Sequence, residues 1–326
     1  MDQEMRDASL TLPTVDDVRL ASKRLAPYIV RTPLLRLNLR DAPNKIYLKL
    51  ENLQSIGAFK ARPMGNIVLS TERNALRNGV YTASSGNAGL GLAWIAHQLG
   101  IGATVYAPDS GPAAKLEPAR DLGARVRLVS NDQWWTIIEN NGHPTDSGYY
   151  VDAVRSLSAM AGNGTIGLEI VEQLPEVDTV IIPFGGGGIA CGIASVFDVL
   201  KPDTRIVVAE SEAAAPLSAA FREGRPVRVT VQPSFISGAG APTVLTEMWP
   251  LIRHVVDSTV VISVSDVAEA IRLMFLHNRV VAEGAGAIPV AAALSGNAGS
   301  GTTVCVVTGG NIDQRTFCNI LNRQPL

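Results

Sequence analysis

The sequence predicts an α/β protein with doubly wound parallel sheets. Strand-like apolar runs alternate along the chain with helical patterns, for example at residues 80–83, 88–99 and 103–107. The runs at 179–184 and 303–308 consist almost entirely of apolar and β-branched residues, which is typical of strands covered by helices on both faces. The chain has 30 glycines and an aromatic fraction of only 5%, as expected of a protein with many tight loops.

The predicted elements form two series, at about residues 75–154 and 165–310. The patterns indicate strands at 45–50, 80–83, 103–107, 125–129, 179–184, 205–210 and 303–308. They indicate helices at 14–24, 59–70, 88–99, 115–122, 165–173, 189–200 and 267–278. Two such series predict two domains with a cleft between them.

Length and charge narrow the class of protein. The chain has 326 residues and a hydrophobic fraction of 46%, enough to enclose a large core. The net charge of −2 gives no basis for binding nucleic acid or an anionic membrane. No apolar run can span a bilayer and the start of the chain is too charged for a signal peptide, so we expect a cytoplasmic protein. The cysteines Cys191, Cys305 and Cys318 match neither a disulfide framework nor a zinc site.

Lys60 is the first candidate for chemistry. It follows Phe59 in a stretch that begins with a glycine turn at Gly57 and leads into a predicted helix. Burial disfavours the charged form of a lysine, so a buried Lys60 has a lowered pKa and a neutral amine that can attack a carbonyl group. Because most lysines are solvated surface residues, the case for Lys60 depends on the loops that follow.

A loop rich in hydrogen-bond donors follows the strand at 80–83. It consists of Ser84, Ser85, Gly86 and Asn87 and leads into the helix at 88–99. The N–H groups and the dipole at a helix N-terminus suit a carboxylate or a phosphate. An ordinary helix cap uses the same residue types, so the loop alone does not distinguish the two interpretations.

Four glycines lie between the strand at 179–184 and the next helix: Gly185, Gly186, Gly187 and Gly188. A simple turn rarely uses four glycines, whereas a bare backbone can surround a phosphate with N–H groups. The same loop matches the G-x-G-x-x-A dinucleotide fingerprint, and Glu210 ends the next strand, where a ribose-binding acid is expected. A nicotinamide-dependent oxidoreductase is therefore the main alternative, although it leaves Lys60 unexplained.

A third loop, Thr308-Gly309-Gly310-Asn311, follows the last strand. A hydroxyl followed by two glycines can hydrogen-bond to a ring nitrogen that lies close to the backbone. The same residues also suit a plain turn, and only the other loops favour the ligand interpretation.

Five motifs occur together in the order and spacing of a known family. They are Gly-Ala-Phe-Lys-Ala-Arg at 57–62, Ser-Ser-Gly-Asn at 84–87, the glycines at 185–188, Glu-Gly-Ala-Gly-Ala at 283–287 and Thr-Gly-Gly-Asn at 308–311. With these motifs the chain resembles a fold-type II pyridoxal-phosphate enzyme, which has the tryptophan synthase β-like fold. The resemblance is to the group of threonine dehydratase, serine racemase and hydroxyaspartate dehydratase.

The resemblance implies pyridoxal 5'-phosphate as cofactor. Lys60 would hold it as an imine and shuttle the α-proton of the substrate, and Phe59 would support the ring region. Asn87 would bind the phenolic oxygen, Thr308 would face the pyridine nitrogen, and Glu283 would border the ring. The glycines at 185–188 would bind the phosphate.

The resemblance also implies where an amino-acid substrate binds. Its carboxylate would be received by Ser84, Ser85, Gly86, Asn87 and the N–H group of Ala88. Ser85 also occupies the position at which serine racemase has the base that acts on the second face of the substrate. Residues 1–74 and 155–326 would form a large cofactor-binding domain and residues 75–154 a small domain that carries this loop, with the active site in the cleft. Relatives are commonly dimers, which implies a homodimer.

The implied reaction is a β-elimination, in which a β-hydroxy amino acid such as threonine or serine is converted into a 2-oxo acid and ammonia. A hydroxyl at Thr308 cannot fully protonate the ring nitrogen, which favours loss of the β-hydroxyl group over transamination. A racemase and a hydroxyaspartate dehydratase are the alternatives within the family. A non-catalytic binding protein is an alternative of another class, but it would be expected to have lost Lys60.

Four positions depart from the pattern of the family. Ala88 and Leu90 stand where threonine dehydratases and serine racemases usually have histidine and glutamine, and Ile56 and Ala58 replace polar residues of the lysine loop. These changes predict a larger and more apolar pocket, suited to a bulky substrate such as phenylserine.

The divalent-metal site of the family is also altered. Glu210 matches its first ligand and Ala214 offers a carbonyl oxygen, but the second carboxylate is replaced by Pro216. Hard cations require several oxygen ligands, among them carboxylates, so we expect no metal site.

Overall fold

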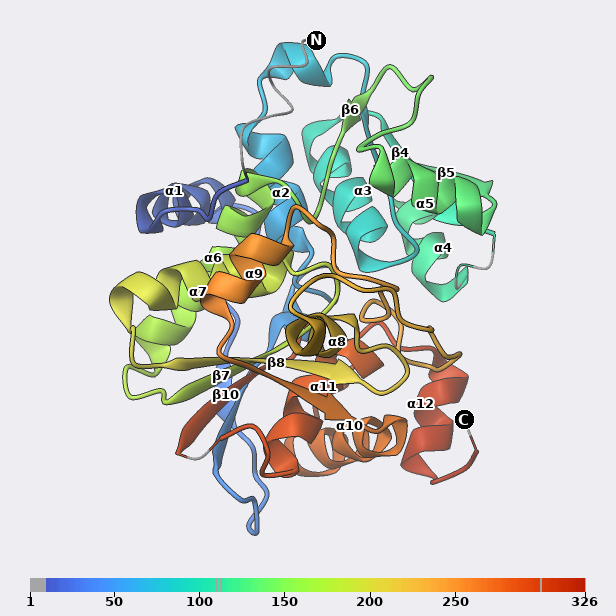
Figure 1. Ribbon diagram of the computed structural model, residues 1–326. Coiled ribbons are helices and arrows are strands. Elements are labelled where there is room, and N and C mark those ends of the chain that lie inside the picture. The colour runs from blue at the N-terminus through green and yellow to red at the C-terminus, as the bar shows by residue number, and fades with distance from the viewer. Residues whose placement is uncertain (1–9, 110, 112, 300, 326) are drawn as a thin grey trace.

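The computed structural model describes residues 10–109, 111, 113–299 and 301–325, and its strands form two sheets (Figure 1). The larger sheet contains β1 (Leu34–Arg36), β2 (Lys45–Lys49), β7 (Thr179–Pro183), β8 (Arg205–Ser211), β9 (Ser258–Ile262) and β10 (Thr302–Val306). The smaller sheet contains β3 (Val80–Ala83), β4 (Ala103–Pro108), β5 (Arg125–Val129) and β6 (Tyr149–Tyr150). Their orders are β1-β2-β10-β7-β8-β9 and β5-β4-β3-β6.

The strands are parallel with one exception. Val304 of β10, for example, pairs with Tyr47 of β2 and with Val180 of β7 in parallel register. The edge strand β1, which the sequence patterns did not predict, is antiparallel to β2. The reason is the short connection of residues 37–44, because a parallel pair requires a crossover of a dozen residues or more.

The helices lie between these strands along the chain. They are α1 (Val15–Leu25), α2 (Ala61–Ser70), α3 (Asn87–Leu99), α4 (Ala113–Asp121), α5 (Asn131–Glu139), α6 (Leu157–Gln173), α7 (Gly188–Leu200), α8 (Pro216–Glu223), α9 (Trp249–Val255), α10 (Val264–Asn278), α11 (Gly284–Leu294) and α12 (Gln314–Leu321). Two short 3-10 turns occur at Glu51–Leu53 and Arg73–Leu76.

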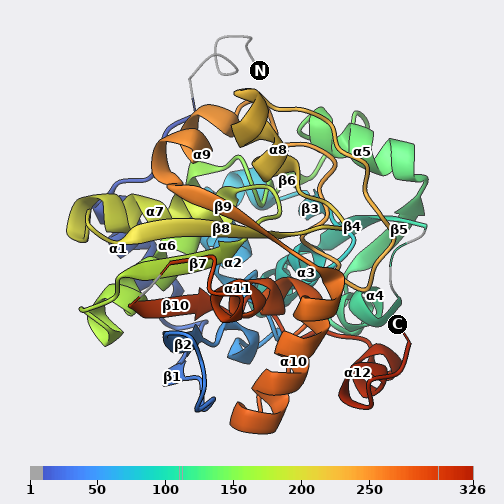
Figure 2. The same ribbon diagram turned by 60° about the horizontal axis from the view of Figure 1, so that its bottom comes forward.

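Helices cover both faces of the larger sheet (Figure 2). Ile181 and Val207 pack on one face in a core cluster with residues of α10 and α11. The alternate strand residues Val180 and Val208 pack on the other face with residues of α6 and α7. This arrangement confirms the doubly wound α/β fold, and it explains why strands β7 and β8 consist of almost uninterrupted apolar residues.

The smaller sheet is built entirely from strands between residues 80 and 150, and helices α3, α4 and α5 surround it (Figure 1). This grouping supports the division into a small domain at 75–154 and a large domain, whose boundaries stay a prediction. Within the described residues, no helix combines the length and the apolar character needed to cross a membrane.

Several element boundaries differ from the predicted ones. Helix α2 starts at Ala61, so Lys60 lies at its N-cap and not inside the helix. Helix α6 starts at Leu157, earlier than predicted, because the oxygen of Ser156 caps it. The sequence patterns missed α11, whose small apolar residues are buried on all sides and therefore show no helical period.

Helices α6 and α7 pack with their backbones close together. A Cβ atom on Gly192 of α7 would overlap the carbonyl oxygen of Met160 and lie 2.8 Å from Cβ of Asn163. On the facing helix, a Cβ atom on Gly164 would lie 2.8 Å from the carbonyl oxygen of Gly192. Only glycine permits this approach.

We therefore expect Gly192→Ala to lower the free energy of unfolding by about 1–3 kcal/mol, because the added methyl group overpacks the contact between the helices. Urea denaturation measures the change. Gly102→Ala is the control, since a Cβ atom there meets no atom within 4 Å, and it should change stability by less than about 0.5 kcal/mol. Equal effects of the two substitutions would contradict the packing argument.

Candidate active site

The loop that carries Lys60 lies against the loop that follows β10. The N–H group of Phe59 donates to the carbonyl oxygen of Thr308 at 2.9 Å, and the N–H group of Gly310 donates to Gly57 at the same distance. Ala58 and Gly309 form an antiparallel bridge between these hydrogen bonds. Two predicted site residues that are far apart in the sequence, Lys60 and Thr308, are thereby brought together.

The amine of Lys60 has the properties expected of a nucleophile. Its side chain is half-buried, and Nζ lies 4.8 Å from the centroid of the Phe59 ring. Burial lowers the pKa of Lys60 to about 8, against the opposing effect of the negative charge of Asp152. The neutral fraction near neutral pH is therefore far larger than for an exposed lysine, and the neutral amine is the form that attacks a carbonyl group.

A buried ion cluster anchors the chain two residues after Lys60. Arg62 is fully buried and forms two hydrogen bonds with Glu51, from Nε at 2.7 Å and from Nη2 at 2.8 Å. Its Nη1 group donates to Glu169 of α6 at 2.7 Å. Lys49 completes the cluster by donating to Glu169. Two positive and two negative side chains thus enclose one another without net charge.

The pKa shifts of Glu51 and Arg62 favour their charged forms, whereas burial lowers the pKa of Lys49. Burial alone would raise the pKa of Glu51, but the adjacent Arg62 guanidinium outweighs it and the pKa is lowered. The pKa of Arg62 is raised, because Glu51 and Glu169 outweigh the effect of burial.

The four glycines connect β7 to α7. Gly187 is the N-cap of α7 and has a left-handed backbone with φ of 92°. A Cβ atom on Gly186 would lie 2.7 Å from Cγ1 of Val154, and one on Gly188 would lie 3.0 Å from the carbonyl oxygen of Val154. Within the described residues, no hydrogen bond is found from the N–H groups of 185–188. The loop is a tight cradle of N–H donors at a helix N-terminus, which suits a phosphate.

The serine loop lies at the N-terminus of α3. Gly86 is the N-cap and receives no side-chain cap, so the first N–H groups of the helix are available to a ligand. Oγ of Ser84 accepts a hydrogen bond from the N–H group of Gly86 at 3.1 Å, which shapes the turn. A Cβ atom on Gly91 would lie 2.9 Å from the carbonyl oxygen of Lys60, so α3 passes directly beside the lysine. Ser85 and Ala88 are half-buried in the same loop.

Asn87, Glu283 and Asn311 form a polar network behind this loop. Nδ2 of Asn87 donates to Oε1 of Glu283 at 2.6 Å, and Nδ2 of Asn311 donates to Oδ1 of Asn87 at 2.9 Å. Glu283 is buried and precedes α11, where its N–H group donates to Gly309 at 2.9 Å. The motifs at 84–87, 283–287 and 308–311 therefore meet at one place.

Sequence reasoning missed the segment at 152–155. Val154 packs against the glycine cradle, and Asp152 is the carboxylate that opposes the lowered pKa of Lys60. Nε of Arg155 donates to Asp152 at 2.7 Å, which fixes the segment. Its only signal in the sequence is an Asp-x-x-Arg pair in a loop between two elements, which is too common to identify a site.

Three of the four departures from the family pattern, Ile56, Ala58 and Leu90, are buried core residues. Ile56 and Leu90 pack in one hydrophobic cluster with residues of α2 and α3, and Ala88 packs against it. Ala58 is fully buried at its bridge with Gly309. Apolar packing between the lysine loop and α3 accounts for Ile56 and Leu90 without an enlarged substrate pocket.

Glu210 is engaged in a helix cap. It is buried, and its carboxyl oxygens accept hydrogen bonds from the N–H groups of Leu217 at 2.8 Å and Ser218 at 2.7 Å and from the hydroxyl of Ser218. It thus satisfies the N-terminus of α8, which begins at Pro216. These contacts support the prediction that no metal binds here. They also leave Glu210 badly placed for a ribose.

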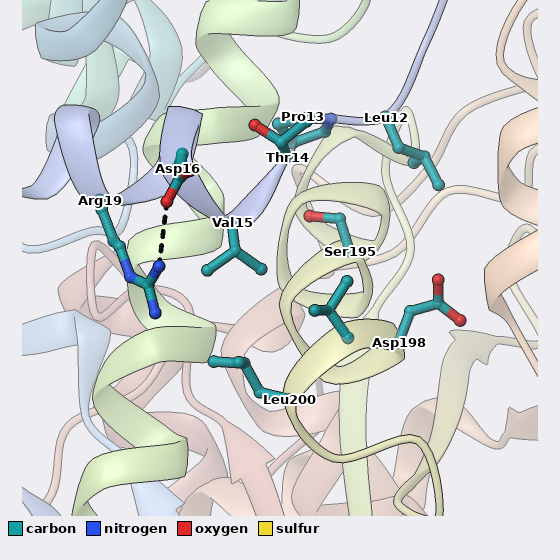
Figure 3. A pocket seen from close by; sticks show the side chains of 10 residues that line it. Leu12, Pro13, Thr14, Val15, Asp16, Arg19, Ser195, Asp198 and Leu200 are labelled. Atoms are coloured by element: carbon teal, nitrogen blue, oxygen red, sulfur yellow. Dashed lines mark hydrogen bonds and ion pairs between the residues drawn. The ribbon is translucent and has the colours of Figure 1, made fainter.

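The surface has two pockets near or away from these loops. The first lies away from them, and the second is lined partly by residues of the lysine loop and of the loop after β10. One of about 470 Å³ lies between residues 12–19 and α7, and its ion pair joins Arg19 to Asp16 (Figure 3). The other, of about 370 Å³, adjoins Asn52, Gly57 and Asn311. The first contains none of the predicted site residues, so the candidate site is the meeting place of the four loops.

Comparison with known proteins identifies the class to which this arrangement belongs. Residues 25–309 match the family model of "Pyridoxal-phosphate dependent enzyme". The chain belongs to this family, and its cofactor is pyridoxal 5'-phosphate. The fold is that of the fold-type II enzymes.

Individual members of the family with named activities are similar to this chain. The chain is 37% identical over 312 residues to an L-threonine ammonia-lyase of Geobacter sulfurreducens, covering 94% of this chain and 77% of the relative. It is 32% identical over 316 residues to a putative threonine dehydratase of Sinorhizobium fredii, covering 95% of each. Maize serine racemase superposes with a TM-score of 0.87 at 28% identity, covering 96% and 98% of the two chains. A threonine deaminase from T.th. superposes with a TM-score of 0.81 at 30% identity, covering 92% and 99%.

The residues present fit this cofactor. A phosphate suits the cradle at 185–188, where side chains are excluded on steric grounds. An aldehyde suits the neutral amine of Lys60. Family membership thereby decides between the two cofactors that the glycine loop suggested, in favour of pyridoxal phosphate.

The ion cluster yields a prediction for Arg62. Arg62→Leu leaves Glu51 buried without its partner, so the free energy of unfolding should fall by about 3–5 kcal/mol, as measured by urea denaturation. Arg31→Leu is the matched control, because Arg31 pairs with Glu172 while 55% of its side chain is exposed, and it should cost less than about 1 kcal/mol. A loss below about 1 kcal/mol for Arg62→Leu would show that the cluster does not anchor the loop.

Proposed function

We propose that this chain removes the hydroxyl and amino groups of a small β-hydroxy amino acid, threonine or serine, to form a 2-oxo acid and ammonia. The observation that carries the proposal is the amine of Lys60, with its lowered pKa, beside a phosphate-type cradle and a carboxylate-type loop. The activities of the relatives support the same reaction class.

The cofactor is held by groups from several loops. The N–H groups at 185–188 would bind its phosphate, and Phe59 packs beside the lysine. Thr308 would face the ring nitrogen and Glu283 would border the ring. The side-chain amide of Asn87 would bind the phenolic oxygen of the ring.

The substrate is held through its carboxylate at the start of α3. The N–H groups of the first helical turn are directed toward it, and the helix dipole stabilises its negative charge. The residues that receive it are Ser84, Ser85 and Gly86, together with the N–H groups of Asn87 and Ala88.

Proton movement is assigned to Lys60. When bound, pyridoxal phosphate withdraws electrons from the α-carbon of the substrate. The amine of Lys60 attaches the cofactor in the resting protein and, once released from it, accepts the α-proton. By resemblance to serine racemase, Ser85 is the candidate for a base on the opposite face of the substrate. A racemase, which returns the proton from that face, is therefore the second candidate, supported by the likeness to maize serine racemase.

Lys60→Ala should abolish covalent attachment of the cofactor and lower turnover by at least about a hundredfold, because the base is removed. Borohydride reduction followed by peptide mass spectrometry locates the attachment. In the wild-type apo-protein, the rate of cofactor attachment should rise with pH through about 8, since the neutral amine increases above the lowered pKa of Lys60. Lys23→Ala, at a lysine of α1 that lies outside the site, is the control. Trapping of the cofactor at another lysine would exclude Lys60.

Substrate choice is tested with a panel of threonine, serine, hydroxyaspartate and phenylserine, with coupled detection of 2-oxo acids and chiral analysis of recovered substrate. Core packing accounts for Ile56 and Leu90 without a pocket for a bulky side chain, so kcat/KM for phenylserine should not exceed that for threonine. A preference for phenylserine would restore the enlarged pocket suggested by Ala88.

A chelator should leave threonine turnover within about twofold, because Glu210 is engaged by α8.

A further inference from the structure

Asn311 makes two hydrogen bonds with one amide nitrogen. Nδ2 donates to the carbonyl oxygen of Ile56 and to Oδ1 of Asn87, each at 2.9 Å. These partners belong to the lysine loop and to the start of α3, respectively. Both hydrogens of the amide are thereby used, and Asn311 connects the element that holds Lys60 with the side chain of Asn87.

The contact decides which way the amide of Asn87 faces. An asparagine amide has an oxygen that only accepts and a nitrogen that only donates, and their assignment follows from the hydrogen-bond network. Because Asn311 presents an N–H group, the atom of Asn87 that faces it must be the oxygen. The nitrogen of Asn87 then lies on the other side, where one of its hydrogens is donated to Glu283 at 2.6 Å.

The surroundings leave Asn311 little freedom. Gly57 has φ of 70°, and a Cβ atom there would lie 3.2 Å from Cγ of Asn311. A Cβ atom on Gly309 would overlap Oε1 of Glu283 and lie 3.2 Å from Nδ2 of Asn87. The three side chains and the two glycine backbones are packed so closely that reversal of one amide requires the others to change.

We propose that Asn311 is a positioning residue, which orients the amide of Asn87 so that an N–H group, and not its carbonyl oxygen, faces the ring oxygen of pyridoxal phosphate. The proposal rests on the assignment of Asn87 to that oxygen in the proposed function. An N–H donor favours the ionised form of the ring hydroxyl, whereas a carbonyl oxygen favours the protonated form. Asn311 therefore controls the ionisation of the bound cofactor without touching it.

The test uses the visible absorption of the bound cofactor as a function of pH, together with cofactor affinity. Asn311→Leu removes the donor at similar volume, so the apparent pKa of the visible band should rise by roughly one unit. Affinity of the apo-protein for pyridoxal phosphate should fall about tenfold, as expected for loss of a hydrogen bond to a charged group. Asn311→Asp keeps the shape but presents only acceptors to Asn87, and it should shift the band in the same direction.

Asn52→Leu is the matched control. Nδ2 of Asn52 donates to the carbonyl oxygen of Val281 at 3.0 Å, so this buried asparagine also connects distant segments near Gly310 but makes no hydrogen bond to Asn87. It should leave the pKa of the visible band unchanged, even where it lowers the melting temperature as much as Asn311→Leu. Equal spectral shifts for both variants, or none for Asn311→Leu and Asn311→Asp, would overturn the proposal.

A double-mutant cycle separates action through Asn87 from a general loosening of the site. In an Asn87→Ala background, Asn311→Leu should no longer shift the visible band, because the amide that it orients is absent. A full shift in that background would also overturn the proposal. Failure of the proposed function has a different signature, namely a wild-type protein without a visible band trapped at Lys60.

Discussion

The buried ion cluster around Arg62 is the constraint on which the site depends. Arg62, Glu51, Glu169 and Lys49 bring charges from β2, a 3-10 turn, α2 and α6 into the interior, where each is acceptable only while its partners remain. Lys60 lies two residues before Arg62, so the cluster fixes the start of α2 and with it the candidate amine of Lys60. Replacement of buried ion pairs by apolar residues can give equal stability in other proteins, which suggests that here the cluster is retained for position.

The sheet topology places the other candidate site residues near the amine of Lys60. Strands β2, β10 and β7 are parallel neighbours, so the loops that follow them reach the same edge of the larger sheet. The lysine loop, Thr308 and the four glycines occupy these three loops. The serine loop comes from the smaller sheet, and Gly91 allows α3 to approach Lys60 closely. The candidate site thus combines a cradle of N–H donors from one sheet with the serine loop from the other.

Much of this arrangement could be predicted from sequence, because the chemistry is carried by unusual residues at the ends of apolar strands. Four successive glycines, a serine pair before a helix and a lysine behind a glycine turn are local patterns. The antiparallel strand β1, the segment at Asp152 and the core positions of Ile56 and Leu90 were not predicted. Each depends on a partner far along the chain, which no local pattern reports.

The sequence by itself determined the fold class and the cofactor-binding motifs and indicated Lys60 as the candidate lysine, since these follow from periodicity and from residue types at fixed spacing. Only the tertiary structure decided how these groups are oriented and ionised. The pKa of Lys60 follows from its burial, the charges of Arg62 and Glu51 from their mutual contact, and the direction of the Asn87 amide from Asn311. Burial and hydrogen bonding depend on the distances between atoms, and those distances arise only when segments hundreds of residues apart pack together.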